Sequence, residues 1–414
     1  MYALVDAVAF YASAEKVFDP TIRNKPVVVL TNNDGCICAV CPIARKLGIP
    51  KFIPFFKIRD FLYKHNVIIR SSNYELYADL SEKMMNVIGT FCDNQYIYSI
   101  DESFLNLKSY SCINDLYKYG QEIRRAVWQQ VKLPVGVGFG LTPTLSKAAN
   151  HAAKKLSGFN GVAVINSDQS KHKILQRMKV DQVWGIGSRL GKKLNLMNIH
   201  SALDLANQDP KNMRKQFSVT VERTVSELNG MRCLDWDDIK SVKKEIFSTR
   251  SFGQRITDFN EFRSALIFHA YTVAKKARAQ SSLIKRIVVF GSSSPHDNGY
   301  YTNSVSIQFT SANDNTLYIA QCVAKAAKQI YAPNVRFYKC GVGAIELTDS
   351  YQLDLFSNNI NKPELMQCLD SINNRYGTGT LMLGSMKPEK WAMKRDFMSP
   401  QYTTNWHDIP IIEC

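Results

Sequence analysis

The sequence predicts a multi-domain α/β protein, and three observations support this fold class. The chain has 414 residues, which is longer than a single hydrophobic core normally serves. Short apolar runs typical of strands alternate with segments of helical spacing over residues 1–165, the pattern of an α/β domain built around one sheet. Apolar residues make up 45% of the chain and aromatic residues 11%, so a largely disordered protein is excluded.

Residues 1–165 carry the elements of this predicted sheet in order. A short apolar run ends at Asp6, and a buried strand is expected at 26–30 because its residues are mostly β-branched. Asn33 and Asp34 follow with a glycine, and these residue types tolerate the positive φ of a tight hairpin turn. Helices are expected at 72–91 and 145–156, and strands at 96–100, 104–107 and 135–139.

The remaining chain divides by pattern into four further parts. Residues 166–235 become mainly helical, and Trp236 with its acidic neighbours marks a linker at 236–243. Strand patterns return around a helical stretch in residues 244–347, which we expect to form a second domain of helices and strands. Residues 348–414 are weakly patterned, and we expect an extended or partly ordered C-terminal tail.

The chain is strongly basic. Its 52 Lys and Arg residues against 36 Asp and Glu give 52 − 36 = +16, with a pI near 9.3. Half of this surplus lies in residues 243–347, where 14 basic and 6 acidic residues give +8. Such a charge indicates a polyanionic partner, nucleic acid before membrane. The alternative is that the charge serves solubility alone.

Nothing in the sequence indicates secretion or a membrane span. No apolar stretch approaches the roughly 18 residues that a span needs, and the N-terminal residues lack a basic region followed by an apolar one. Ten cysteines are scattered along the chain, which fits reduced thiols in the cytoplasm. Cys36, Cys38 and Cys41 lie close together without a fourth ligand, so a zinc site is not expected there.

Three carboxylates stand at predicted strand ends. Asp6 ends one strand, and Asp101 and Glu102 lie between two others. Carboxylates flanked by apolar residues are costly unless a cation balances them, and neighbouring strands would bring the three to one sheet edge. Oxygen ligands of this kind suit Mg²⁺, and two such ions would activate an attacking oxygen and neutralise a leaving one. The alternative is that Asp101 and Glu102 only make a polar turn.

The residues around these carboxylates carry a resemblance to a known family. Together they resemble the signature and neighbouring sequence of Y-family translesion DNA polymerases, from Met1 to about Thr404. The matching stretches are Asp6–Glu15, Lys25–Leu30, Asn32–Cys36, Ser71–Asp79, Tyr98–Phe104, Asn150–Lys155, Val183–Gly187 and Ser251–Asp258. The resemblance implies a right-hand architecture: palm and fingers at 1–165, a helical thumb at 166–235, a little finger at 244–347 and a C-terminal tail.

The resemblance also implies roles for single residues in the nucleotide site. Asp6, Asp101 and Glu102 would bind two Mg²⁺ ions, with the backbone carbonyl of Ala7 as a further ligand. Tyr11 matches a steric gate that excludes a ribose 2′-hydroxyl, against the alternative of a core tyrosine. Cations at two further positions would grip the incoming dNTP. These are Arg45 and Lys154. The alternative for Arg45, and for Lys155 next to Lys154, is a solvated surface charge.

Two positions depart from the family pattern. Pro42 stands where many relatives have a tyrosine that contacts the triphosphate, so that contact cannot form here. Val8 occupies a place that is polar in a similar sequence. Neither departure removes a metal ligand, so we expect an effect on nucleotide affinity rather than on the chemistry.

Two regions are expected to contact DNA. Residues 183–187 fit a helix-hairpin-helix turn, in which Gly185 and Gly187 let backbone N–H groups approach a phosphate, with Lys192 and Lys193 nearby. An ordinary helix–helix turn is the alternative. In the second region the resemblance implies that a sheet lies along the DNA and mainly contacts phosphates. We therefore expect sequence-independent, salt-sensitive binding there. The candidates are Lys243, Lys244, Arg250, Arg255, Lys285, Arg286 and Lys339.

The C-terminal tail holds a short peptide, Gln352-Leu353-Asp354-Leu355-Phe356, that resembles the motif by which bacterial polymerases bind the β sliding clamp. The family resemblance further implies primer-template DNA, a processed UmuD-like dimer and RecA as partners, and a cytoplasmic, nucleoid-associated location. The predicted function is error-prone translesion synthesis in the SOS response to DNA damage. Two alternatives are a non-catalytic, clamp-tethered DNA-binding subunit of that response and a nucleotidyl cyclase.

Overall fold

The computed structural model describes residues 1–108, 113–234, 242–349, 362–377, 379–386, 391 and 393–409. The chain forms two compact units. Unit 1 comprises Met1–Lys240 together with Arg395–Cys414, and unit 2 comprises Ser241–Lys394. No helix among the described residues is long and apolar enough to cross a membrane.

Unit 1 is built around a five-stranded central sheet of order β5-β6-β1-β7-β8. The outer strand β8 pairs with β7 in parallel, and the other neighbouring strands pair in antiparallel fashion. The strands are β1 (Tyr2–Ala7), β5 (Gln95–Ile97), β6 (Glu102–Asn106), β7 (Val135–Gly140) and β8 (Val162–Ile165). The strand order makes β1 the neighbour of β6, so the carboxylate-bearing strand ends predicted from the sequence lie side by side.

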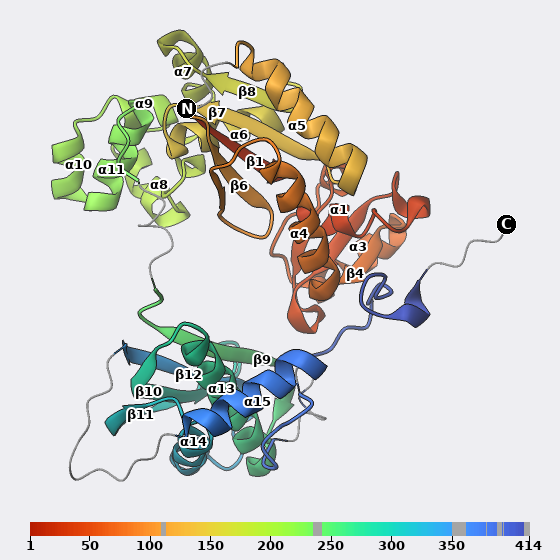
Figure 1. Cartoon of the computed structure of the whole chain (residues 1–414), viewed down its shortest axis with the longest axis vertical. Helices are drawn as coiled ribbons and strands as arrows, with labels where there is room; N and C mark the ends of the chain where they lie inside the picture. Colours follow the sequence, from red (N-terminus) through yellow and green to blue (C-terminus); the bar gives the residue numbers. More distant parts are fainter. Residues whose placement is uncertain are drawn as a thin grey trace. The chain divides into compact units, whose positions relative to one another are not determined.

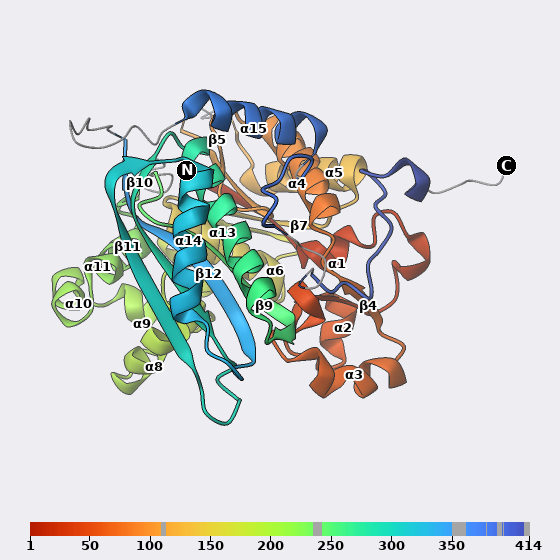
Figure 2. The same ribbon diagram turned by 90° about the horizontal axis from the view of Figure 1, so that it is seen from below.

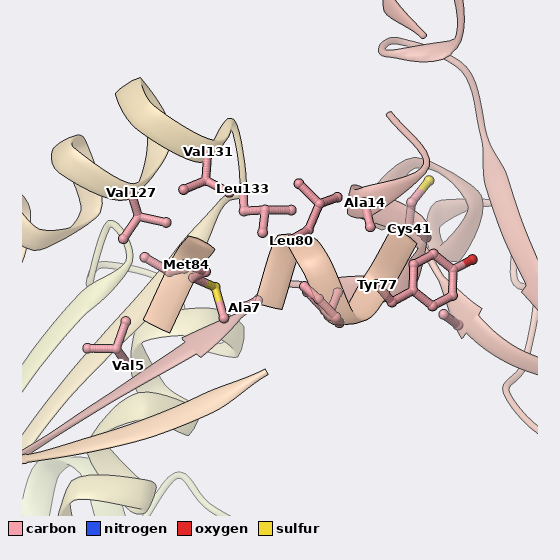
Figure 3. Packing of buried hydrophobic residues seen from close by; sticks show 14 of the residues in the cluster. Val5, Ala7, Ala14, Cys41, Tyr77, Leu80, Met84, Val127, Val131 and Leu133 are labelled. Atoms are coloured by element: carbon pink, nitrogen blue, oxygen red, sulfur yellow. The ribbon is translucent and has the colours of Figure 1, made fainter. Parts of the chain in front are cut away.

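Helices pack on both faces of the central sheet (Figure 1). One face holds α4 (Tyr74–Gly89) and α5 (Leu116–Val131), and the other holds α6 (Pro143–Lys155). Tyr77, Leu80 and Met84 follow one face of α4 into the core (Figure 3). They pack in a cluster that also contains Val5, Ala7, Val127, Val131 and Leu133.

Glycines in β7 let α6 approach this strand closely. A Cβ atom built on Gly138 would lie 2.1 Å from the backbone nitrogen of Asn150. A Cβ atom on Gly136 would lie 2.5 Å from Cγ of Lys154. The glycines of Gly136–Gly140 therefore serve close helix–sheet packing and leave room for the Lys154 side chain.

A small three-stranded sheet of order β3-β2-β4 completes this part of unit 1. Its strands are β2 (Val27–Leu30), β3 (Ile37–Val40) and β4 (Ile68–Ser71), with helices α1 (Phe10–Ala14), α2 (Pro42–Lys46) and α3 (Phe55–Lys64) nearby in the chain. Asn33 and Asp34 have φ of 59° and 51°. The prediction of positive φ between β2 and β3 is confirmed at these two residues, which belong to the short 3-10 helix η2 (Asn32–Asp34). A second 3-10 helix, η1 (Pro20–Ile22), precedes β2.

Residues 168–228 are helical, as their spacing predicted. The elements are α7 (Asp168–Leu175), η3 (Val180–Gln182), α8 (Ser188–Leu196), α9 (Ala202–Ala206), α10 (Pro210–Gln216) and α11 (Val219–Leu228). Their apolar residues form one core with those of α6. The buried Glu227 carboxylate fixes α11 to the start of α6, because it accepts a hydrogen bond of 3.0 Å from the Thr144 amide.

Unit 2 contains a four-stranded antiparallel sheet of order β11-β10-β12-β9. Helices α13 (Phe259–Ala279) and α14 (Thr316–Ile330) pack against this sheet (Figure 2). The strands are β9 (Ile246–Ile256), β10 (Leu283–Ser292), β11 (Thr302–Asn313) and β12 (Phe337–Thr348). In the first part of β9, buried Ile246 and Ser248 alternate with exposed Phe247 and Thr249, so one face of the strand is covered.

Two segments of the predicted extended or partly ordered tail, which begins at residue 348, are ordered. Residues Pro363–Tyr376 form helix α15. Its Met366 and Leu369 pack with Ile267 of α13 and Ala320 of α14. Two apolar residues three positions apart are only a weak sequence signal for a helix. The second segment, residues 395–409, packs against unit 1 and includes the short 3-10 helix η4 (Trp406–Asp408).

Candidate active site

Asp6, Asp101 and Glu102 meet where β1 and β6 pair. Asp6 is the register partner of Glu102, and the Ala7 amide donates a hydrogen bond of 3.0 Å to the Asp101 carbonyl. The Asp101 carboxylate accepts a hydrogen bond of 2.7 Å from the Ser99 hydroxyl. The structure therefore brings the three predicted carboxylates to one end of neighbouring strands.

Each of the two paired carboxylates faces a lysine of α6. Lys154 forms an ion pair with Asp6, and it reaches this position across Gly136, which has no side chain to obstruct it. The Lys147 ammonium lies 3.0 Å from Oε2 of Glu102. Among the described residues, no group of three or more His, Cys, Asp or Glu side chains is arranged to hold a metal ion.

The charged form of Asp6 is nevertheless disfavoured in this site. The pKa of Asp6 is raised from its ordinary value to about 7, mainly because the group is buried. Lys154 lowers this pKa, whereas Glu102 and Asp101 raise it through repulsion. A further cation would relieve that repulsion, and the oxygen donors are of the type that Mg²⁺ accepts. The donor type therefore suits a divalent metal ion, and in the present arrangement lysines hold two of the three carboxylates.

Lys147 was not identified from the sequence. Its Nζ atom lies 4.5 Å from the centre of the Tyr98 ring and 5.0 Å from that of Trp184. Phe104 adds a third ring at 5.8 Å. These contacts are cation–π interactions. They place Lys147, the partner of Glu102, between the central sheet and the turn before α8. Nothing in the sequence around Lys147 predicts this cage, because its three rings come from separate segments.

A cavity of about 430 Å³ opens beside the carboxylates. Asp6 and Asp101 line it from the strand ends, and the two residues predicted to grip the dNTP, Arg45 and Lys154, line it together with Tyr11. Its remaining lining residues are Ala7, Val8, Ala9, Phe10, Cys38, Ala39, Lys51, Ile100 and Lys155. The sequence-predicted nucleotide residues thus share one cavity.

Four cations crowd this cavity. Besides Arg45 and Lys154 it contains Lys51, which sequence reasoning missed, and Lys155. The pKa of Lys155 is lowered by burial and then by the charges of Arg45, Lys154 and Lys51, whereas Asp6 raises it. Positive groups gathered at this density are suited to a polyanion such as a triphosphate.

Tyr11 is held by other aromatic side chains. Its ring stacks on Tyr77 at a centroid distance of 4.5 Å and an interplanar angle of 15°. Tyr74 contacts it edge-on at 6.1 Å. Tyr11 therefore packs on α4 through its stack with Tyr77 and also lines the cavity, and its role as a steric gate stays a prediction.

Of the two departures from the family pattern, Val8 lines this cavity, whereas Pro42 does not. Pro42 is the first residue of α2, the helix that carries Arg45 in its last turn, and proline is well suited to that first position. The Val8 amide donates to the Pro134 carbonyl at 2.8 Å, and its own carbonyl accepts from the Ser13 hydroxyl at 2.7 Å. Pro42 therefore favours the start of α2, and Val8 is held through its backbone.

The predicted DNA-binding turn lies between η3 and α8. Gly185 has φ of 87°, which favours glycine, and a Cβ on Gly187 would meet nothing within 4 Å. Lys192 and Lys193 are exposed on α8. The open backbone lies at the start of α8 and the exposed lysines lie further along the same helix, an arrangement compatible with phosphate contact.

Arg250 and Arg255 do not have equivalent surroundings on β9. The Arg250 guanidinium lies over the rings of Phe268 and Trp391, at 5.8 and 5.6 Å. Phe268 belongs to α13, so Arg250 lies on the helix-covered side of the sheet. Arg255 stacks on the Tyr338 ring at 4.4 Å and lies 3.7 Å from Asp297. The peptide predicted to bind a clamp, Gln352–Phe356, lies outside the described residues.

Comparisons with known proteins place the chain in a family. The model of the impB/mucB/samB family matches residues 5–151, and that of its C-terminal domain matches residues 243–355. A domain of unknown function matches residues 363–412.

Similar proteins extend over almost the whole chain. Protein UmuC of Salmonella typhimurium (strain LT2) is 39% identical over 418 residues, which cover 99% of each chain. Protein SamB of Salmonella typhimurium is 38% identical over 421 residues, again 99% of each. DNA polymerase IV 1 of Bacillus subtilis (strain 168) is 23% identical over 404 residues, 94% of each.

Solved structures share the fold at lower identity. A Y-family DNA polymerase chimera is 19% identical with a TM-score of 0.65, over 85% of this chain and 99% of the other. An insertion ternary complex of Dbh DNA polymerase gives a TM-score of 0.53 at 19% identity, over 84% and 99%. The predicted Y-family architecture is confirmed. Because relatives of this family match it almost from end to end, the chain belongs to the impB/mucB/samB family and is a UmuC-type, Y-family translesion DNA polymerase.

Proposed function

We propose that this polymerase performs error-prone, template-directed nucleotidyl transfer with two Mg²⁺ ions during the SOS response to DNA damage. The primer 3′-hydroxyl oxygen forms a bond to the α-phosphorus of a dNTP, the bond from this phosphorus to the bridging oxygen breaks, and pyrophosphate leaves. The observation that carries the proposal is the shared cavity of about 430 Å³, in which carboxylates, cations and Tyr11 meet.

The metal ligands in this proposal are the carboxylates of Asp6, Asp101 and Glu102 and the carbonyl of Ala7. Y-family polymerases generally depend on a divalent metal, and the raised pKa of Asp6 supports such a need here. When bound, two Mg²⁺ ions would favour deprotonation of the attacking hydroxyl and neutralise the negative charge on the leaving oxygen. The ammonium of Lys154, which is paired with Asp6, is then available to the triphosphate.

The remaining cavity residues would bind and orient the nucleotide. Arg45 and Lys154 approach the cavity from α2 and α6, so the triphosphate would lie between cations on two elements. Placed charges of this kind stabilise the negative charge that develops on phosphoryl oxygens. Tyr11 would lie beneath the sugar and exclude a 2′-hydroxyl.

We assign palm and fingers to residues 1–165, the thumb to 166–235 and the little finger to 244–347. Gly185 and Gly187 with the exposed Lys192 and Lys193 would hold primer-template DNA by its phosphates, and Arg255 would add a contact from β9. Arg250 is less suited to this role because it lies on the side of the sheet that α13 covers, where its guanidinium packs on Phe268. We propose a UmuD-like processed dimer, RecA and, through Gln352–Phe356, the β sliding clamp as partners at the nucleoid in the cytoplasm.

Primer extension on an abasic-site template tests this proposal. The assay contains Mg²⁺, dNTPs, RecA filament, a UmuD-like dimer and clamp, and compares the wild type with Asp101→Ala and with Asp60→Ala. Asp60 is exposed on α3, away from the site, so its variant should extend the primer normally. Extension by all but Asp101→Ala is the expected result. Equal extension by Asp101→Ala contradicts the metal-site assignment, and failure of the wild type with intact DNA binding favours a non-catalytic subunit.

A further inference from the structure

Residues 395–409, which we name the C-terminal strap, dock on the edge of the small sheet in unit 1. β4 is an edge strand, and its last residue, Ser71, donates its amide to the Phe397 carbonyl at 2.9 Å. The Phe397 amide donates to the Ser71 hydroxyl at 3.0 Å. The Asp396 amide donates to Oδ2 of the buried Asp34 at 2.8 Å. The strap thus continues the hydrogen bonding of the sheet.

The strap next reaches the start of α4. Asn73, which is fully buried, caps this helix by accepting a hydrogen bond from the Leu76 amide. Its side-chain amide donates to the Ser399 hydroxyl at 3.0 Å and to the Pro400 carbonyl at 3.3 Å. One side chain therefore joins the strap to the helix that carries Tyr74 and Tyr77.

The strap also reaches the end of α1, the helix that carries Tyr11. Glu15 ends this helix, and its amide donates to the Tyr11 carbonyl at 3.2 Å. Its buried carboxylate accepts a hydrogen bond of 2.6 Å from the Tyr77 hydroxyl. Burial raises the pKa of Glu15, whereas the hydroxyls of Tyr77 and Ser399 lower it. Ser399 thus acts on Glu15 electrostatically, whereas its hydrogen bond is with Asn73.

A second contact anchors the strap to the segment after α1. Tyr402 stacks on Phe18 at a centroid distance of 5.0 Å and an interplanar angle of 16°. The strap therefore bridges the two helices, α1 and α4, whose side chains Tyr11 and Tyr77 stack on each other at the cavity. Movement of either helix would shift the Tyr11 ring.

We propose that Ser399 is a positioning residue that, through Asn73 at the start of α4 and the stacked Tyr77, fixes Tyr11 and sharpens the selection of deoxynucleotides over ribonucleotides. The inference rests on the proposed function, in which Tyr11 is the steric gate. Exclusion by a clash depends on where the ring lies, and a misplacement of about 1 Å at a reacting centre can change rates 100-fold. A segment within the match to a domain of unknown function thereby acquires a role in substrate choice.

The test compares kcat/KM for a dNTP and the matching ribonucleotide in the full-length protein. Ser399→Ala should lower the discrimination about three- to tenfold, the effect of losing roughly one hydrogen bond, mainly by faster ribonucleotide insertion. Ser399→Thr keeps the hydroxyl and should restore most of the discrimination. Thr404→Ala, at an exposed position of the same strap, should behave as the wild type. An unchanged ratio in Ser399→Ala together with a lower Tm would overturn the proposal, because the strap would then only stabilise the fold.

A second variant guards against a folding failure of Ser399→Ala. Asn73→Ser keeps a residue type that caps helices well but loses the amide that binds Ser399 and Pro400, so it should also lower the discrimination. Ser399→Ala should add nothing in a Tyr11→Ala background, since coupled sites are not additive. If Tyr11→Ala alone leaves discrimination intact, the gate assignment is wrong. If Tyr11→Ala abolishes it while both strap variants do not change it, only the strap inference is wrong.

Discussion

The ammonium group of Lys147 lies between both carboxylate oxygens of Glu102, 3.1 Å from Oε1 and 3.0 Å from Oε2. The same ammonium lies over the Trp184 ring, which precedes α8. Lys147 therefore orients Glu102, which is proposed to bind metal, and also contacts Trp184, which lies in the segment proposed to bind DNA. This relationship makes Lys147 a natural place to test whether the two regions act together.

Lys147→Met should slow nucleotide insertion by about 10- to 100-fold, since hydrogen bonds to charged groups contribute roughly 1.5–3 kcal/mol. Methionine keeps an aliphatic side chain among the rings and removes only the charge. Single-turnover insertion with saturating dNTP measures the effect. Lys83→Met removes an exposed lysine on α4 and should leave the rate unchanged. A wild-type rate in Lys147→Met would show that Glu102 needs no such partner.

Mg²⁺ should stabilise the folded protein in the absence of DNA. The carboxylates of Asp6, Asp101 and Glu102 repel one another, and a ligand that binds only the folded state raises the Tm. Thermal unfolding with increasing Mg²⁺ measures the shift. Asp101→Asn should show a smaller shift than the wild type, whereas EDTA should abolish both the shift and primer extension. A shift of the same size in Asp101→Asn would place the ion elsewhere.

Arg255→Ala should weaken DNA binding and reduce the slope of log K against log salt by about 1, as expected for one lost phosphate contact. Arg250→Ala should leave this slope unchanged and lower the stability of unit 2, because its guanidinium packs on Phe268 and Trp391. Binding titrations at several salt concentrations, with unfolding curves of both variants, separate the effects. The reverse result would assign the phosphate contact to Arg250.

Unit 2 should lose stability as the pH falls below about 6.5. His269 is buried against Ser248, and its pKa is lowered to about 3, first by burial and then by Arg250 and Lys276. The unfolded chain binds a proton between pH 6.5 and 3 that the folded unit does not, so stability rises with pH across this window. Hydrogen exchange of α13 at several pH values measures it. His269→Asn should flatten this dependence, and an unchanged slope would exclude His269 as its source.

The sequence predicted the elements whose signals are local. Asp6 and Glu102 could be expected to meet because each stands at the end of an apolar strand, and antiparallel pairing of β1 and β6 brings those ends together. Asn33 and Asp34 announced a turn by their residue types. The helical character of residues 168–228 was equally visible. For these features, the spacing of apolar residues or the type of a single residue is enough to predict the local structure.

Other features depend on contacts between distant segments. The Lys147 cage requires Trp184 to approach Tyr98, two residues 86 positions apart in the sequence. The packing of Arg250 depends on which face of β9 the helices cover, a choice that strand alternation leaves open. The strap relies on single hydrogen bonds such as that from Asn73 to Ser399. No periodicity in 395–409 indicates such bonds, so the segment was interpreted as part of a tail.

Because the chain leaves unit 1 at Lys240 and returns at Arg395, unit 2 is an insertion within unit 1 and not an appended module. A single proteolytic cut inside unit 2 leaves each fragment joined to unit 1 by its own end. Exchange of this unit between relatives accordingly requires two compatible junctions, one on either side. Recombination that replaces unit 2 must also preserve the docking of residues 395–409, so the inserted unit and the strap that follows it are constrained together.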